Sequence, residues 1–173
     1  MGALLEVLKY VLPSLVVFIT AYLIIKSFFE DQLKQKEMEI RAIHKKDLTP
    51  LRLQAYERLV LFLERISPHS LLPRTTQVSS TVAHLQSQLL NQIRTEFEHN
   101  MSQQIYISKE AWSVTKSAKE QIIKIINQSA DKIAKDAPAF ELSKTILEYT
   151  IQTGSSPTDT AINFLKKEVD SYF

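Results

Sequence analysis

The sequence contains no cysteine and only two glycines, Gly2 and Gly154. The absence of cysteine excludes disulfides and a cysteine nucleophile, and it agrees with a reducing compartment. Phosphate-cradling loops and many turns of sheet-rich folds need glycine, so a chain this poor in glycine does not build them. Residues 47–173 carry fourteen Lys and Arg against fourteen Asp and Glu. This neutral balance argues against nucleic acid as a partner.

The longest run without a charge lies near the N-terminus, from Tyr10 to Ile25, and apolar character extends from Leu4 to Phe29. A helix needs about twenty apolar residues to cross roughly 30 Å of hydrocarbon. The run therefore predicts a transmembrane helix, with residues 1–29 as the anchor. Bulky residues follow the run where a signal peptide has small ones for cleavage, so we expect the anchor to be retained.

Basic residues are distributed unequally around this run. Only Lys9 precedes it, whereas six basic residues follow it closely: Lys26, Lys34, Lys36, Arg41, Lys45 and Lys46. Basic flanks stay on the cytoplasmic side of a membrane. The pattern predicts a single-pass protein with its N-terminus outside and its C-terminal domain in the cytoplasm.

Residues 30–48 are predicted to form a charged helical stalk that continues the membrane helix, because neither glycine nor proline occurs between Ser14 and Thr49. Four apolar residues and Lys36 fall at the alternating spacings of a coiled-coil seam; the apolar ones are Phe29, Leu33, Ile40 and Ile43. Such a seam pairs with a second copy or docks a partner. The alternative is a solvated helix whose thin apolar stripe contacts its own domain.

Residues 49–173 are predicted to form a bundle of about five helices joined by short loops, so the fold class is all-α. Apolar residues recur at spacings of three and four, and no alternating pattern is long enough for a strand. The expected helices are residues 50–66, 77–104, 109–135, 140–153 and 157–173. Gly154 should supply the C-terminal cap of the fourth helix.

The first helix of this bundle is expected to begin at Thr49 and Pro50, a cap followed by a first-turn proline. Its centre, from Leu59 to Leu63, is apolar on all sides and predicts the most buried helix of the domain. Residues 67–77 read as a looser connection to the second helix.

The only pattern typical of a metal site is Glu96-x-x-His99, which is one half of a di-iron carboxylate motif. That site needs a second Glu-x-x-His and two further glutamates, and the sequence has no second copy. We therefore expect a solvated helical face at Glu96, Glu98 and His99, and no metal ligand, cofactor or catalytic residue. A zinc-protease His-Glu-x-x-His and a glycine-flanked nucleophilic serine are also missing.

Tyr106 and Trp112 are candidate partner-binding residues, because aromatic side chains are enriched in the centres of interfaces. The alternative for Trp112 is partly buried packing beside the apolar stripe of its helix. For Tyr106 the alternative is a helix junction, residues 103–108, in which glutamines satisfy exposed helix-end carbonyls and isoleucines fill the core.

Three features together carry a resemblance: the segment LQAYERLVLFLERISP, the segment EFEHNMSQQIYIS, and Trp112 shortly after it. With the N-terminal apolar run and the charged stalk, they resemble a functionally uncharacterised family of small single-span bacterial membrane proteins. The resemblance covers most of the chain. It implies an anchor in the bacterial inner membrane and a cytoplasmic helical domain, and it transfers no catalytic or binding residue.

The function expected from these observations is that of a membrane-anchored, non-enzymatic interaction or scaffold protein, an accessory subunit of a larger inner-membrane complex. Its partners would be the lipid bilayer and other membrane proteins or a second copy, with no nucleic acid and no small-molecule substrate. The expected partner-binding residues are Phe29, Leu33, Ile40, Ile43, Tyr106 and Trp112. Two alternatives remain, a homo-oligomeric membrane organiser that pairs through the stalk and an enzyme or metal protein with a site in the bundle.

Overall fold

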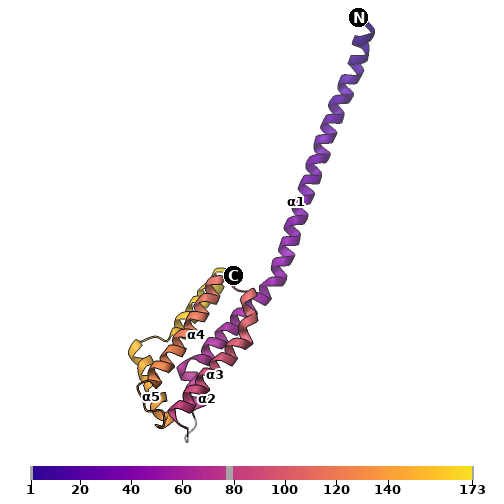
Figure 1. Cartoon of the computed structure of the whole chain (residues 1–173). Helices are drawn as coiled ribbons and strands as arrows, with labels where there is room; N and C mark the ends of the chain where they lie inside the picture. Colours follow the sequence, from indigo (N-terminus) through magenta and orange to yellow (C-terminus); the bar gives the residue numbers. More distant parts are fainter. Residues whose placement is uncertain (1, 77–79, 173) are drawn as a thin grey trace. The chain divides into compact units, whose positions relative to one another are not determined.

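A computed structural model describes residues 2–76 and 80–172 (Figure 1). Within these ranges the side chains of residues 2–8, 10, 12–14, 41–45, 47 and 172 lie outside the description. The described residues form helices, with one isolated bridge between Thr81 and Pro138 and no named strand. The prediction of an all-helical fold is confirmed. The chain divides into two compact units, Met1–Thr49 and Pro50–Phe173, which we call the N-terminal unit and the bundle unit.

Helix α1 extends from Gly2 to Ile66 without a break. The predicted start of a new helix at Thr49 and Pro50 is therefore wrong. Proline removes one backbone donor from a helix, but it does not prevent the helix from continuing when the flanking residues favour it. Leu, Arg, Gln, Ala and Glu follow Pro50, and all of them are good helix formers.

In the part of the chain that the structure describes, none of the helices combines the length and the apolar character that crossing a membrane requires. Charged residues lie at both ends of the apolar run, with Glu6 and Lys9 before it and Lys26, Glu30 and Asp31 after it. Charged side chains inside hydrocarbon are costly. The finding contradicts the predicted transmembrane anchor at residues 1–29, the single-pass topology and the inner-membrane localisation.

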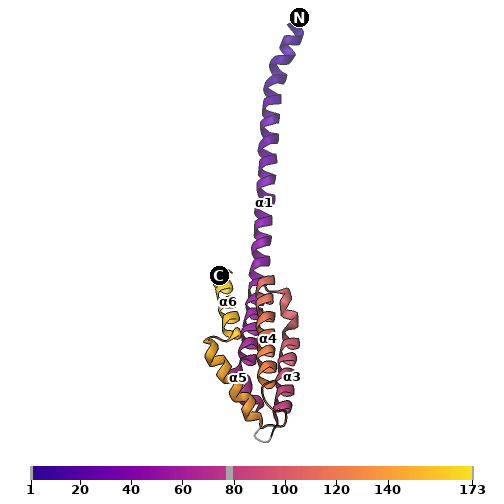
Figure 2. The ribbon, with the colours of Figure 1, turned by 60° about the vertical axis from the view of Figure 1, so that its left-hand side comes forward.

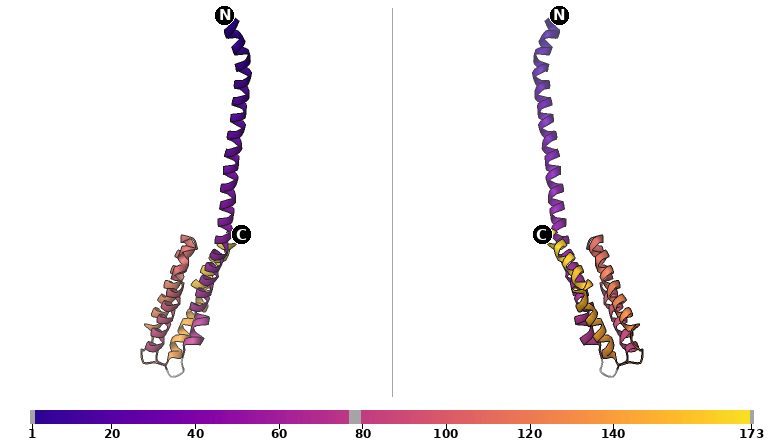
Figure 3. Two further views of the ribbon diagram at one scale, coloured as in Figure 1. Left: turned by 90° about the vertical axis from the view of Figure 1, so that its right-hand side faces the viewer. Right: turned by 90° about the vertical axis from the view of Figure 1, so that its left-hand side faces the viewer.

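The bundle unit packs the end of α1 against five further helices around one apolar core (Figure 2). Their bounds are α2 Pro68–Thr75, α3 Val82–Asn100, α4 Lys109–Ala130, α5 Ala139–Thr153 and α6 Pro157–Tyr172. A short 3-10 helix, η1, covers Met101–Ile105. Helices α3 and α4 lie side by side (Figure 3). Large side chains with almost no exposure fill the centre; they include Phe62, Leu63, Leu85, Leu89, Ile93, Ile122, Leu142, Ile146 and Leu165.

Local sequence signals explain several of the helix ends in this unit. Ser108 accepts a hydrogen bond from the backbone N–H of Ala111 at 2.9 Å, as an N-cap residue should. Gly154 ends α5 in the left-handed region, with φ of 72°. Pro68 stands in the first turn of α2. This helix lies in the stretch where we expected a loose connection. One side of it is buried through Leu71 and Leu72.

Helix α4 ends at Ala130, five residues before the predicted Lys135. The residues after it pair with the start of α3 instead of extending the helix. The backbone N–H of Val82 donates to the carbonyl of Ala137 at 2.9 Å, and that of Ala83 donates to the carbonyl of Lys135 at 3.1 Å. These bonds satisfy two of the first N–H groups of α3, which have no partner inside their own helix.

Replacing Gly154 with alanine is expected to lower the free energy of unfolding by about 1 kcal/mol, because a Cβ is disfavoured at positive φ. Nothing lies within 4 Å of the added Cβ, so steric contact adds nothing to this cost. Gly154→Asn should cost less, since asparagine tolerates the left-handed region. Chemical denaturation followed by circular dichroism measures the difference, and equal midpoints for all three proteins would contradict the observed cap.

Candidate functional site

Three of the four predicted seam residues are described, and all three are exposed. Phe29 is 60% exposed, Leu33 63% and Ile40 54%. The side chain of Ile43 lies outside the described residues. At 3.6 residues per turn the three described residues lie on one face of α1. Phe29, Leu33 and Ile40 therefore form an exposed apolar row, which we call the apolar row, and the coiled-coil seam itself stays a prediction.

The apolar exposure extends toward the N-terminus from this row. Between Leu15 and Phe28 every described large apolar side chain is exposed. Phe28 and Phe29 contact each other edge to face, with ring centroids 6.2 Å apart. Contiguous exposed apolar surface of this extent is typical of a site where another molecule binds.

Trp112 belongs to a row of aromatic side chains at the edge of the core. Its ring stacks on Phe97 with centroids 5.3 Å apart, and Phe97 contacts Phe62 at 5.8 Å. The ammonium group of Lys119 lies 4.1 Å from the centre of the Phe97 ring. Trp112 is half-buried, so this packing accounts for much of its apolar surface. The alternative of partly buried core packing thus describes Trp112.

Tyr106 is half-buried at the junction between η1 and α4. Its carbonyl oxygen accepts a hydrogen bond from Nε of Arg52 on α1 at 3.1 Å. Its backbone N–H donates to the carbonyl of Gln103 at 3.0 Å. These bonds fix the junction to α1, while Ile105 beside it is exposed and does not fill the core as expected.

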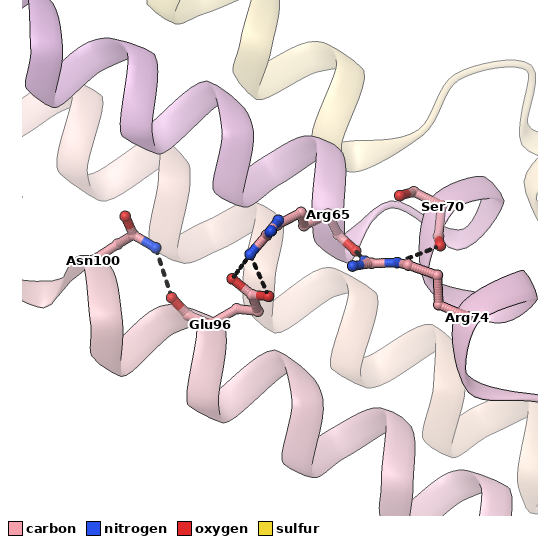
Figure 4. Close-up of polar contacts among 5 residues, drawn as sticks. All are labelled: Arg65, Ser70, Arg74, Glu96 and Asn100. Atoms are coloured by element: carbon pink, nitrogen blue, oxygen red, sulfur yellow. Dashed lines mark hydrogen bonds and ion pairs between the residues drawn. The ribbon is translucent and has the colours of Figure 1, made fainter.

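An ion pair joins Arg65 of α1 to Glu96 of α3 in the bundle unit (Figure 4). Nη1 of Arg65 donates to both carboxylate oxygens of Glu96, at 2.9 and 3.1 Å. The Glu96 side chain is 11% exposed, whereas that of Arg65 is 48% exposed. The ion pair therefore gives a nearly buried carboxylate its charged partner.

Neighbouring residues extend this contact to three helices (Figure 4). Asn100 donates to the carbonyl of Glu96 at 2.8 Å, within α3. Arg74 of α2 donates to the carbonyl of Arg65 at 2.6 Å and to that of Ser70 at 2.9 Å. The bond from Arg74 satisfies the carbonyl of Arg65 at the end of α1, which no further helical turn reaches.

The sequence-based interpretation of Glu96 is wrong, because the side chain is buried and paired rather than solvated. It is correct for Glu98 and His99, which are exposed. Both oxygens of Glu96 already accept from Arg65, and no group of three or more acidic or histidine side chains among the described residues is arranged to hold a metal ion. The sequence contains one sign that Glu96 is buried. Glu96 lies three residues after Ile93, on the core-facing stripe of α3.

Two grooves flank the exposed side of α1 in the bundle unit. One has a volume of about 680 Å³. Residues of α1 and of the end of α3 line it, and most of them are polar or charged, including Arg58, Arg65, Glu96, His99 and Asn100. The other, of about 390 Å³, lies between α1 and α6 and is mainly apolar. Glu57 and Leu61 of α1 border both grooves.

The sequence pattern of DUF7935, a family of unknown function, matches residues 2–172. The chain belongs to this family. The prediction of a functionally uncharacterised family is confirmed, and the match bears on neither a membrane nor a bacterial source. No protein of curated function and no solved structure is significantly similar to the chain. The function of this DUF7935 member must therefore be inferred from its own surfaces.

The Arg65–Glu96 pair of this DUF7935 member predicts an asymmetric response to substitution. Arg65→Met keeps the apolar stem and leaves the nearly buried carboxylate without its partner, so the free energy of unfolding should fall by about 1–3 kcal/mol. Glu96→Gln leaves a half-exposed guanidinium that water solvates, and it should cost under about 1 kcal/mol. Urea denaturation measures both variants. A larger cost for Glu96→Gln would show that burial of the carboxylate is not the controlling factor.

Proposed function

We propose that this DUF7935 protein is a non-enzymatic interaction protein, which holds its helical bundle beside another protein through the exposed apolar row of α1. The supporting observation is the exposure of Phe29, Leu33 and Ile40, each more than half accessible. When a second helix covers apolar side chains on one face of a helix, it removes them from water. This lowers the free energy of the system and favours association.

The expected strength of this contact is moderate. Complete burial of an exposed large apolar side chain stabilises an association by roughly 1.5–3 kcal/mol, and these three are already partly buried. Association also costs several kcal/mol of lost freedom. The row alone thus gives weak binding, and the exposed apolar residues from Leu15 to Phe28 increase the area available to a partner.

A weak contact is useful in a scaffold because it acts together with others. When two molecules are already held in one assembly, each further contact forms at a high effective concentration. We propose that the row serves as such a contact in an accessory subunit of a larger protein complex. The bundle unit, with one apolar core, is the folded body that is thereby held in place.

A second candidate function is supported by the same row. The apolar positions of two copies can cover each other, and the protein is then a homo-oligomeric organiser without a foreign partner. The molar mass of the purified chain separates the two functions. A defined dimer or larger oligomer of the chain alone favours self-association, and a monomer that co-purifies with another protein favours the accessory subunit.

The double variant Leu33→Glu/Ile40→Glu is expected to weaken the association at least tenfold, because it places two charges in the apolar row. The melting temperature of the bundle should not change, since both residues lie in the N-terminal unit. Light scattering in a mild detergent measures the mass, and affinity purification measures the amount of any co-purified protein.

A matched control places the same two charges elsewhere on the helix. Gln35 and Met38 lie on other faces of α1 at 100° per residue, and Met38 is also exposed. Gln35→Glu/Met38→Glu should therefore leave the association intact. If both double variants associate like the unchanged protein, the apolar row is not the contact surface and the proposal fails.

A further inference from the structure

Charged residues on both edges of the apolar row indicate what kind of helix can cover it. Glu30 and Glu37 lie about 100° and 80° from Phe29 on one side of α1, and Glu39 lies about 80° from it on the other side. All three glutamates are exposed, and the remaining residue at these edges, Gln32, is uncharged. Within the length of the row, from residue 29 to residue 40, both edges are therefore acidic.

The basic residues of the same stretch do not lie on these edges. Lys34 lies about 140° from Phe29, toward the far side of the helix, where Met38 is also found. Lys36 lies within the row itself, about 20° from Phe29. A lysine stem can follow apolar surface while its ammonium group reaches outward. The row thus presents an apolar stripe with one lysine in it and a negative charge along each edge.

This charge pattern disfavours a second copy as the partner. In parallel pairing the row of one copy faces the same row of the other, so Lys36 meets its equivalent inside the contact. In antiparallel pairing each edge meets the same edge of the second copy, so Glu30 and Glu37 face glutamates. Like charges that are brought together reject a partner. The row therefore favours a helix of different sequence.

We propose that the partner of the row is a helix of another protein, with an apolar stripe and basic residues along both edges of that stripe. This inference rests on the proposed function and names the chemistry of the partner. Charges beside a contact between helices set partner choice and orientation. Each exposed ion pair contributes little by itself. The apolar stripe therefore supplies most of the binding, and the acidic edges determine which helix is accepted.

A helix of this chemistry has a second surface to contact in the bundle unit, the groove between α1 and α6 (Figure 2). Glu64 and Asp170 are exposed along its border. Leu61 is 55% exposed at its edge, which contradicts the prediction that the apolar centre of this helix, residues 59–63, is buried on all sides. A test of the proposal therefore has to distinguish the row from this groove.

Two synthetic peptides, each about three heptads long, serve as probes. They share a leucine stripe at heptad spacing and differ only beside it, where one carries lysine and the other glutamate. The like charges of each peptide keep it from pairing with itself. Fluorescence anisotropy with the full-length protein, in a mild detergent at low salt, should show that the lysine peptide binds at least fivefold more tightly. Added salt should reduce this preference, because it screens exposed charges.

Two variants with the same change in net charge locate the contact on α1. Glu30→Lys/Glu37→Lys makes one edge of the row basic, whereas Asp31→Lys/Gln35→Lys/Met38→Lys adds the same charge on the far side of the helix. The first should weaken binding of the lysine peptide at least fivefold and strengthen binding of the glutamate peptide. The second should preserve the ratio of the two affinities.

Two further variants separate the row from the groove. Leu33→Gln/Ile40→Gln removes apolar surface from the row without changing its charge, and Glu64→Lys reverses a charge at the border of the groove. The lysine peptide should lose its binding to the first variant and bind the second like the unchanged protein. Thermal melting confirms that the bundle remains folded in both.

The proposed partner chemistry is overturned if neither peptide binds, if both bind equally, or if Glu30→Lys/Glu37→Lys leaves the preference unchanged. Loss of binding in Glu64→Lys instead of in the row variant overturns it as well, because the groove is then the site. The proposed function still stands in these cases if Leu33→Glu/Ile40→Glu abolishes the co-purification of another protein. If that double variant changes no association at all, both proposals fail.

Discussion

Apolar side chains that stay in contact with water along α1 are the constraint on which the account of this protein depends. Leu33 and Ile40 remain exposed, as do the large apolar residues from Leu15 to Phe29. The hydrophobic effect favours any arrangement that removes such surface from water. A helix with this surface is expected to associate with another molecule, and the proposed function rests on that expectation.

In the bundle unit, by contrast, many large apolar residues are already buried in one core. Phe62, Ile93 and Leu165 belong to one core with almost no exposure. The Arg65–Glu96 pair connects α1 to α3 at the edge of this core and holds the last turn of α1 in place. Leu61 and Glu64 of the same helix line the groove beside α6.

Helical periodicity predicted the bundle well because it reflects burial directly. The positions of Leu85, Leu89 and Ile93 on α3 are fully buried, as their spacing indicated. Local rules were less successful where tertiary contacts decide. Pro50 has the features of a helix start, yet α1 continues through it, and the pairing of residues 135 and 137 with the start of α3 ends α4 early.

The candidate surfaces could be predicted only in part from the sequence. The apolar row was found from its spacing, but the ion pair required knowledge of which residues face each other across α1 and α3. The groove depends on the packing of α6 against α1, which no local pattern encodes. The transmembrane interpretation began from the apolar run between Leu4 and Phe29, whereas none of the described helices is long and apolar enough to cross a membrane.

The absence of cysteine permits a direct measurement of whether another molecule covers the apolar row. A single cysteine is introduced at Ile40, or at Gln35 on another face as a reference, and its rate of alkylation is measured in native extract and in dilute purified protein. The account predicts slower alkylation at position 40 in the extract than in dilute protein, with equal rates at position 35. Equal rates at position 40 in both conditions would contradict it.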